Sequence, residues 1–416
     1  MIKDICFRLI NVVLRGGTLV CKFVLIFFLA KYLAPEEVGF YGLLVATIGY
    51  AFFVVGIEFY TFTSRELIGR DPRDWLPILR DQWVFFFLSY ACFIPLSWIF
   101  FDAGFLSMKY YGWFLLLFFL EHTAQEFNRL LVAMGHQFLA SIILFVRGGA
   151  WAVIVVLMMW VSPQYRSLEF LFVSWALGAG LACVLGLNRF LRLERALLGR
   201  GIDWRWIVRG IKISLPLLVA SLAIRGLFTF DRYWVEAAGG LNVLGAYVLF
   251  AGIAFSIISF LDAGVIAFLY PRVIAAVKEN NDVQYRLLMK ELAKHVVIAT
   301  AIMSIVAYLV SPYVLQWVGK PVYLESIYLL QWLLLAVALY SLSMIPHVGL
   351  YARHKDRTIL CSQLAGLLVF VIGCILGVPA HGVIAVILAM CLAFLVVLIW
   401  KGYAFKLLCA TQPSSA

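Results

Sequence analysis

Five cationic side chains lie within stretches of sequence that are otherwise apolar. They are Arg15, Lys22, Arg147, Arg225 and Arg232, and the last of these lies nearer the end of its stretch. A charged side chain at the centre of a bilayer costs roughly 2.5–3.5 kcal/mol even on a lenient insertion scale. A cationic surface at membrane depth suits an anionic cargo, because guanidinium and ammonium groups donate hydrogen bonds to phosphate oxygens.

The apolar stretches that hold these cations predict membrane-spanning helices. Of the 416 residues, 64% are hydrophobic and 13% are charged, whereas soluble domains are about 45–50% apolar and about 25% charged. A spanning helix needs about 20 apolar residues. Twelve stretches qualify: 9–33, 38–62, 83–101, 110–133, 138–161, 168–189, 213–236, 243–269, 292–315, 325–348, 358–378 and 382–402. We therefore expect an all-α polytopic membrane protein with about 12 transmembrane helices.

The distribution of lysine and arginine predicts the orientation of these helices. Almost all of those outside the spans fall in alternate connections, and the opposite connections hold only Lys31, Lys109, Arg166 and Lys320. Cytoplasmic loops are enriched in Lys and Arg. We expect both termini to be cytoplasmic. The basic residues punctuate apolar spans and do not form one patch, so the net charge of +11 does not indicate a nucleic-acid partner.

The chain resembles a duplication of six helices. Residues 38–44, V-G-F-Y-G-L-L, resemble residues 244–250, L-G-A-Y-V-L-F. Arg15 and Lys22 are seven residues apart, as are Arg225 and Arg232. The predicted organisation is an N-terminal lobe over 1–190, a basic cytoplasmic linker over 191–212, a C-terminal lobe over 213–403 and a tail over 404–416. Two six-helix lobes of the same orientation correspond to a parallel repeat.

A resemblance to a known family rests on several short motifs. Residues 30–41, A-K-Y-L-A-P-E-E-V-G-F-Y, resemble the A-x-x-L-x-P-E-x-x-G-x-Y opening of Wzx-type O-antigen and polysaccharide flippases. These flippases belong to the MOP exporter superfamily, which also contains lipid II flippases and MATE drug exporters. Further similar motifs are Asp231-Arg232, Gly245-Ala246-Tyr247, Tyr270-Pro271-Arg272 and Gly382-Val383.

The resemblance implies a fold, a location and a function. The fold would be a V-shaped bundle of two six-helix lobes in the bacterial inner membrane. The cargo would be an undecaprenyl-diphosphate-linked oligosaccharide, moved to the outer leaflet by alternating access driven by an ion gradient. A polysaccharide polymerase and a chain-length regulator would be candidate partners, and neither cofactor nor metal is expected. The sequence lacks the acidic ion-site cluster of MATE proteins, which leaves the coupling ion open.

Four cations are the candidate cargo ligands. Arg15 and Lys22 lie two helical turns apart on one face of the first span. Arg147 precedes two glycines and Arg225 precedes one, and small neighbours leave room for a ligand or for close helix packing. The alternatives are that Arg15 extends to the inner interface and that Arg147 and Arg225 form ion pairs with other helices.

Acidic residues within the spans are candidates for coupling and gating. Glu121 and His122 could form a proton relay, and an ion pair from Glu121 to Arg147 or Lys22 is the alternative. Asp231 and Arg232 are candidate outer-gate residues; Glu58 and Asp262 are candidate inner-gate residues. An interfacial pair with Glu236 is the alternative for Asp231 and Arg232, and helix-end ion pairs with neighbouring basic residues are the alternative for Glu58 and Asp262. The basic segment from Arg189 to Lys212 is expected to bind anionic lipid and to fix topology.

Other functional classes fit the sequence less well. No G-x-x-x-x-G-K-[ST] motif is present, which excludes an ATP-driven pump of the P-loop class. A membrane-embedded polysaccharide polymerase or transferase would need a large outer loop or a paired acidic motif. A MATE-like small-molecule exporter of cations would need an acidic cavity, and this one is predicted to be basic. The eight cysteines form no C-x-x-C motif, and no disulfide framework is predicted.

Overall fold

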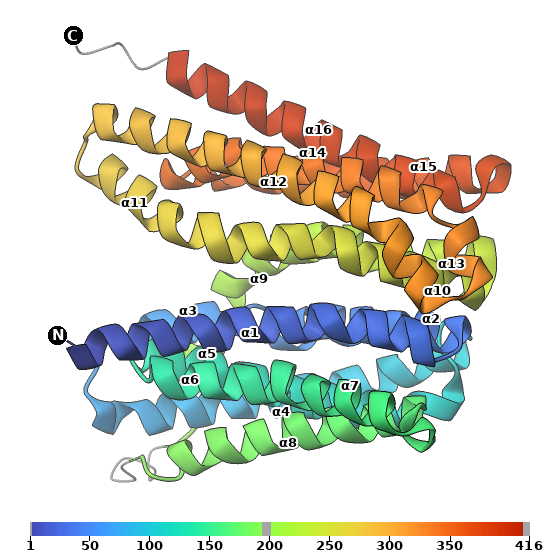
Figure 1. The fold of residues 1–416 in the computed structure, drawn as a ribbon. Helices are drawn as coiled ribbons and strands as arrows, with labels where there is room; N and C mark the ends of the chain where they lie inside the picture. Colours follow the sequence, from blue (N-terminus) through green and yellow to red (C-terminus); the bar gives the residue numbers. More distant parts are fainter. Residues whose placement is uncertain (1, 194–200, 411–416) are drawn as a thin grey trace. The chain divides into compact units, whose positions relative to one another are not determined.

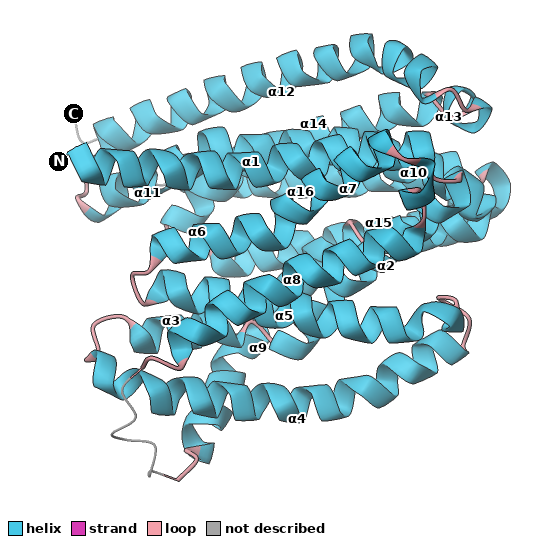
Figure 2. Ribbon diagram, turned by 60° about the horizontal axis from the view of Figure 1, so that its bottom comes forward, coloured by secondary structure: helices cyan, strands magenta, loops and turns pink. Residues whose placement is uncertain are grey.

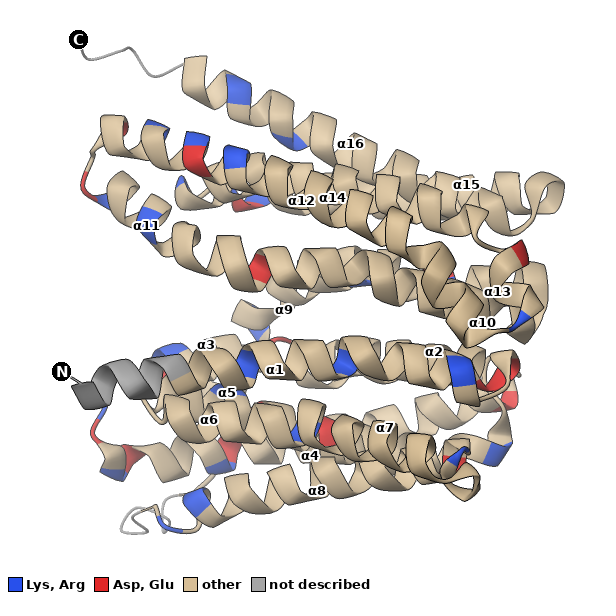
Figure 3. Cartoon of the chain, viewed as in Figure 1, with Lys and Arg blue, Asp and Glu red and all other residues tan. Residues whose placement is uncertain are grey.

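The computed structural model describes residues 2–193 and 201–410, which are helical throughout except for short turns (Figures 1 and 2). No strand occurs in these two ranges. The protein is therefore an all-α polytopic membrane protein, as the composition predicts. Most of the length of the helices carries uncharged residues, as Figure 3 shows.

In the first half of the chain, the described residues form eight α-helices. Their bounds are α1 Ile2–Tyr32, α2 Pro35–Gly56, α3 Phe59–Leu67, α4 Trp75–Asp102, α5 Tyr111–Ala133, α6 Gln137–Phe145, α7 Trp151–Val161 and α8 Leu168–Phe190. A π-helical turn, η3 Val146–Ala150, joins α6 to α7, so that these three elements form one rod. Helices α2 and α3 likewise form the second predicted span, with a break between them.

Eight more α-helices are formed by residues 201–410. Their bounds are α9 Trp204–Leu227, α10 Phe230–Leu261, α11 Ala267–Lys278, α12 Asp282–Val318, α13 Pro321–Glu325, α14 Tyr328–Ala352, α15 Asp356–His381 and α16 Val383–Ala410. A second π-helical turn, η5 Asp262–Ile266, joins α10 to α11. Gly240 interrupts α10 with a φ of 72°, a backbone conformation that glycine adopts without a steric penalty.

Twelve long helical rods correspond to the twelve predicted spans. Ten stretches of the described chain are long and apolar enough to cross a membrane, and one of these, Trp204–Lys278, covers both the seventh and eighth predicted spans. The fourth predicted span is α5, which has the length but contains Glu121, Glu126 and Arg129. The predicted fold class is confirmed.

The chain divides into two compact units. Unit 1 comprises residues 1–28 and 43–222, and unit 2 comprises residues 29–42 and 223–416. Each unit thus contains a segment from the other half of the sequence. The start of α9 belongs to unit 1, where the buried ring of Trp206 packs 5.3 Å from Phe59. Asp81 accepts a hydrogen bond from the Asp203 amide at 3.1 Å, which fixes the entry to α9.

Residues 29–42 pack within unit 2 through glycines. A Cβ atom on Gly245 would overlap the backbone of Pro35, and one on Gly39 would overlap the Leu241 carbonyl. The crossing between α2 and α10 is therefore a backbone-to-backbone contact that only glycine permits. Lys320 donates to the Ala30 carbonyl at 2.8 Å and to the Leu33 carbonyl, and so ties the end of α1 to the turn before α13.

Two of the turns that end helices, one in each unit, have the same local structure. In unit 1 the His136 amide donates to the Leu131 carbonyl at 2.8 Å, and in unit 2 the Lys355 amide donates to the Leu350 carbonyl at 3.0 Å. Both turns are Schellman motifs, with a residue of positive φ just before the donor: Gly135 in the first and His354 in the second. The same local structure therefore follows the fourth and tenth helical rods.

Candidate functional site

Arg147 and Glu121 form an ion pair inside unit 1. The Arg147 Nη1 atom lies 3.0 Å from Glu121 Oε2, and the two side chains are 11% and 7% exposed. Trp175 Nε1 donates to the other carboxylate oxygen at 2.5 Å. The π-helical turn η3 carries Arg147, and π turns are frequent at functional sites. The structure thus contains the ion pair given as the alternative role of Glu121.

Lys22 lies beside this pair. A Cβ atom on Gly148 would lie 3.2 Å from Lys22 Cε, so the lysine side chain runs over the glycine that follows Arg147. Lys22 interacts electrostatically with both Glu121 and Arg147. Its side chain is exposed. One carboxylate therefore faces two cations, and this part of unit 1 keeps a positive charge.

Arg15 lies on the same face of α1, nearer the helix start. Its Nε atom donates to Ser141 Oγ on α6 at 3.4 Å, and the side chain is exposed. Between the two cations, Thr18 packs on Gly148 and Gly149. The seven-residue spacing predicted that Arg15 and Lys22 share a helix face, and both contact the rod that contains Arg147.

His122 points away from Glu121, because consecutive helical residues are about 100° apart. Its Nδ1 atom lies 2.5 Å from the Tyr90 hydroxyl, and its ring stacks on Phe118 at 6.1 Å. The side chain is fully buried, and Nε2 has no hydrogen-bond partner among the described residues. Glu121 and His122 therefore contact different helices.

A second polar cluster occupies the same helix, one turn further on. Glu126 is fully buried and accepts hydrogen bonds from Gln82 Nε2 at 3.0 Å and Arg129 Nη1 at 2.7 Å. The Arg129 guanidinium also lies 3.8 Å from the ring centroid of Tyr60. Glu126 and Arg129 thus form an ion pair between residues three apart on one helix face. The Tyr60 ring and the Glu126 carboxylate together stabilise the positive charge of Arg129.

Glu58 lies at the break between α2 and α3. Ile57 and Glu58 both have positive φ angles, 47° and 55°, which is unusual for residues with side chains and most unusual for a β-branched one. The Glu58 carboxylate is 8% exposed and accepts a hydrogen bond from Ser221 Oγ on α9 at 2.5 Å. Strain of this kind often marks segments that change conformation.

Unit 2 has an irregularity at the equivalent place. Asp262 begins the π-helical turn η5 and is exposed. Tyr340 on α14 interacts electrostatically with both Asp262 and Arg225, which places the two predicted residues near the same ring. Arg225 is exposed and is followed by Gly226, which packs on Phe230 and Leu367. Glu58 and Asp262 thus occupy matching distortions of the second and eighth rods.

Asp231 and Arg232 form a buried group in unit 2. Asp231 is fully buried and accepts a hydrogen bond from the Tyr247 hydroxyl at 2.5 Å. Arg232 Nη1 lies 3.5 Å from Asp231 Oδ1 and also donates to the Phe228 carbonyl. The group crosses the Gly240 kink, because Asp231 precedes it and Tyr247 follows it.

Sequence reasoning missed the neutral partners of these charges. Trp175, Ser221 and Tyr247 each bond a carboxylate that is 16 to 163 residues away. Lys401 was also missed as a buried cation; it is 1% exposed in α16. Residues 194–200 of the basic linker and 411–416 of the tail lie outside the described residues. No cluster of three metal-ligating side chains occurs in the described ranges.

The fold is similar to that of membrane transporters whose structures have been solved. An inward-facing multidrug-resistance MATE transporter of the MOP superfamily aligns with a TM-score of 0.74 at 14% identity, covering 97% of this chain and 96% of that one. The lipid II flippase MurJ, in an inward closed conformation, aligns at 0.70 and 13% identity, covering 96% and 87%. An outward-facing MATE transporter aligns at 0.59 and 14%, covering 96% and 95%.

The chain therefore shares its fold with these transporters. No protein-family model matches the sequence, and no curated protein matches it either. At these identities the likeness concerns the fold alone, and the function has to be argued from the site.

Proposed function

We propose that this protein is a flippase for a lipid-linked oligosaccharide whose diphosphate binds the cations of the spanning helices. The observation that carries the proposal is the exposure of Arg15 and Lys22 at membrane depth on one face of α1. Exposed cations are costly in lipid, and an aqueous cavity would remove that cost. A diphosphate would supply the missing negative charge through charge-assisted hydrogen bonds.

The balance of charge in unit 1 agrees with an anionic cargo. Arg15, Lys22 and Arg147 outnumber Glu121, the one carboxylate paired in this group. Arg147 contributes by holding Glu121, which leaves Lys22 with donors free to turn to a ligand. In unit 2, Arg225 is the corresponding exposed cation. An undecaprenyl-diphosphate-linked repeat unit of a surface polysaccharide has this chemistry.

The remaining roles complete the proposal. We propose that the protein lies in a bacterial inner membrane with both termini in the cytoplasm, and the enrichment of Lys and Arg in alternate connections supports this orientation. Glu58 and Asp262 are proposed inner-gate residues, because both lie at helix irregularities that can change conformation. Asp231 and Arg232 are proposed to stabilise the opposite gate, and Glu121 or His122 to take part in ion coupling.

Transport by purified protein tests the proposal. Reconstituted liposomes would contain a fluorescent lipid diphosphate with a short glycan, and a membrane-impermeant quencher would report its movement between leaflets. Arg15→Ala, Lys22→Ala and Arg225→Ala are expected to slow movement at least about tenfold, since each removes a charged hydrogen-bond donor worth about 1.5–3 kcal/mol. Lys109→Ala, which removes an exposed cation from a turn, is the matched control. Unchanged rates in all three variants would refute the cationic site.

A second candidate function is export of a small cationic molecule, since the fold is shared with a multidrug-resistance MATE transporter. The observation in its favour is the exposed carboxylate of Asp262 within a spanning rod. The same liposomes distinguish the two functions. A cationic dye that is expelled in an Asp262-dependent way, with no movement of the lipid diphosphate, would favour the exporter.

A further inference from the structure

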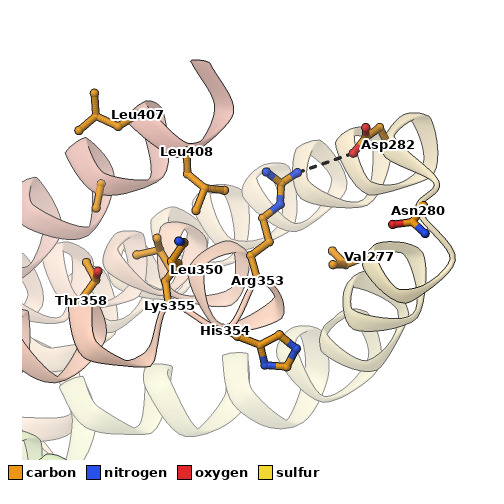
Figure 4. Close-up of a pocket in the computed structure, with 11 residues that line it drawn as sticks. Val277, Asn280, Asp282, Leu350, Arg353, His354, Lys355, Thr358, Leu407 and Leu408 are labelled. Atoms are coloured by element: carbon orange, nitrogen blue, oxygen red, sulfur yellow. Dashed lines mark ion pairs between the residues drawn. The ribbon is translucent and has the colours of Figure 1, made fainter. Parts of the chain in front are cut away.

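A cavity of about 710 Å³ lies at the end of unit 2 where α14 and α16 end and α15 begins. Figure 4 shows its lining, in which Arg353, His354 and Lys355 follow one another on the turn between α14 and α15. Asp282 is the one acidic residue of the lining. The cavity is thus basic and is built from different residues than the proposed translocation site.

The Arg353 guanidinium has donor capacity to spare. Its side chain is 11% exposed and lies 3.8 Å from Asp282, whose side chain is 49% exposed. A charge-assisted hydrogen bond is normally about 2.7–2.9 Å, so this ion pair is loose. The guanidinium carbon lies 4.4 Å from the Tyr285 ring centroid, which holds the group in place. Its Nη1 atom has no partner among the described residues.

The backbone of the turn brings further basic groups to the cavity. His354 has a φ of 56° at the position where a Schellman turn normally has glycine. A side chain in this conformation is sterically strained, so the turn tolerates a penalty that glycine would avoid. Lys355 immediately precedes α15, and the start of a helix attracts anions through its backbone amides.

The opposite wall of the cavity is apolar. Ala404, Leu407 and Leu408 on α16 line it, together with Val277 and Leu350. Leu407 is 49% exposed, so the apolar wall continues onto the outer surface of the helix. A ligand that fits both walls has an anionic group joined to an apolar body, as a phospholipid has.

Unit 1 has a smaller cavity at the matching place in the repeat. It measures about 470 Å³ and is lined by His136, Arg189 and Arg192. Its turn has the same hydrogen bonds as the turn before Lys355. A basic cavity therefore recurs after the fourth and tenth rods, although the residues that supply its charge differ.

We propose that the cavity of unit 2 is a phosphate site that binds the head group of an anionic membrane lipid. Arg353 and Lys355 bind the phosphate, and the α16 leucines contact the glycerol and the start of the acyl chains. In the orientation proposed above, this end of unit 2 lies at the cytoplasmic face, where anionic lipids are abundant. Lipid at this site would stabilise the ends of three helices, independently of any cargo.

Binding to the purified full-length protein in detergent tests the proposal. Thermal unfolding would be followed while dioctanoyl phosphatidylglycerol, dioctanoyl phosphatidylcholine or inorganic phosphate is added, since a ligand of the folded state raises the unfolding temperature. We expect saturable stabilisation by the anionic lipid. Arg353→Lys and Lys355→Ala should each weaken this binding about tenfold. Arg286→Ala on α12, which removes an exposed cation outside the cavity, should leave it unchanged.

The other outcomes are equally informative. Inorganic phosphate that stabilises as strongly as the lipid, and depends on the same two residues, would keep the site but assign it to free phosphate. Equal binding by phosphatidylcholine, or by all the variants, would overturn the proposal. Lys355→Ala removes an exposed side chain, so the test does not depend on whether the Arg353 variant folds. The transport assay is not used, so failure here leaves the flippase proposal standing.

Discussion

Glu121→Gln tests whether the ion pair with Arg147 is structural. The substitution removes the negative charge but keeps an oxygen that can accept the Trp175 hydrogen bond. At 3.0 Å and an effective dielectric constant of about 20, the Coulomb energy of the pair is about 5.5 kcal/mol. Desolvation offsets part of this, and breaking a buried pair typically costs about 3–5 kcal/mol. The variant also leaves Lys22 and Arg147 facing each other, which places it at the upper end of that range.

Arg147→Met should cost less, about 1–3 kcal/mol, because Lys22 is near enough to pair with the remaining carboxylate. The free energy of unfolding would be measured by equilibrium unfolding in mixed detergent micelles. The double variant is expected to be more stable than the sum of the two losses by at least about 1 kcal/mol. Glu169→Gln, at an exposed carboxylate on α8, should change stability by less than about 0.5 kcal/mol.

The result decides what Arg147 does. Losses that add to within about 0.5 kcal/mol would refute a coupled pair and would return Arg147 to the candidate cargo ligands. Coupling would instead assign it to holding Glu121, and a transport defect in Arg147 variants would then need a stability measurement before it could be interpreted.

Three further predictions follow from single contacts. Gly39→Ala should lower the free energy of unfolding by about 1–3 kcal/mol or more, because the added methyl group overlaps the Leu241 carbonyl. Gly49→Ala is the control, since Gly49 has open space around it, and the unfolding temperatures of the two variants would show the difference. Tyr247→Phe should cost about 1–3 kcal/mol in unfolding free energy because buried Asp231 loses a donor, and a change under 0.5 kcal/mol would contradict this. Burial and the nearby positive charge of Arg189 lower the pKa of His136 in the folded protein. As the pH falls below about 6.5, His136 is therefore protonated in the unfolded chain before it is protonated in the folded protein. Stability should fall from pH 7 to pH 5, and His136→Gln should flatten that dependence.

Most of the spans were predictable because the length of an apolar stretch indicates a membrane-spanning helix. The ends of the helices were less predictable than the spans themselves. Helix α12 begins at Asp282, ten residues before the predicted 292, because a helix can continue beyond the bilayer through polar residues that hydropathy does not detect. The break between Arg225 and Asp231, at Phe228 and Thr229, has no proline and little sequence signal.

The candidate residues were identifiable, but their partners were not. Charge within an apolar span marks Arg147 and Glu121 without showing that they meet, since 26 residues separate them. Neighbours in sequence suggested that Glu121 and His122 act together, yet helical geometry directs them to different helices. Arg147 and Asp262 lie in π-helical turns, which rotate their side chains relative to a regular α-helix. A projection of the sequence onto a regular helix therefore does not predict their directions.

The assignment of residues 29–42 to unit 2 and of the start of α9 to unit 1 bears on how the chain matures. During synthesis from the N-terminus, the glycine face of residues 35–42 has no partner until the ribosome has made Gly245. Unit 1, in turn, lacks the Trp206 contact with Phe59 until α9 has been inserted. The midpoint of the sequence is consequently a poor place to divide the gene: each half is expected to require the other, supplied in the same membrane, before either unit is complete.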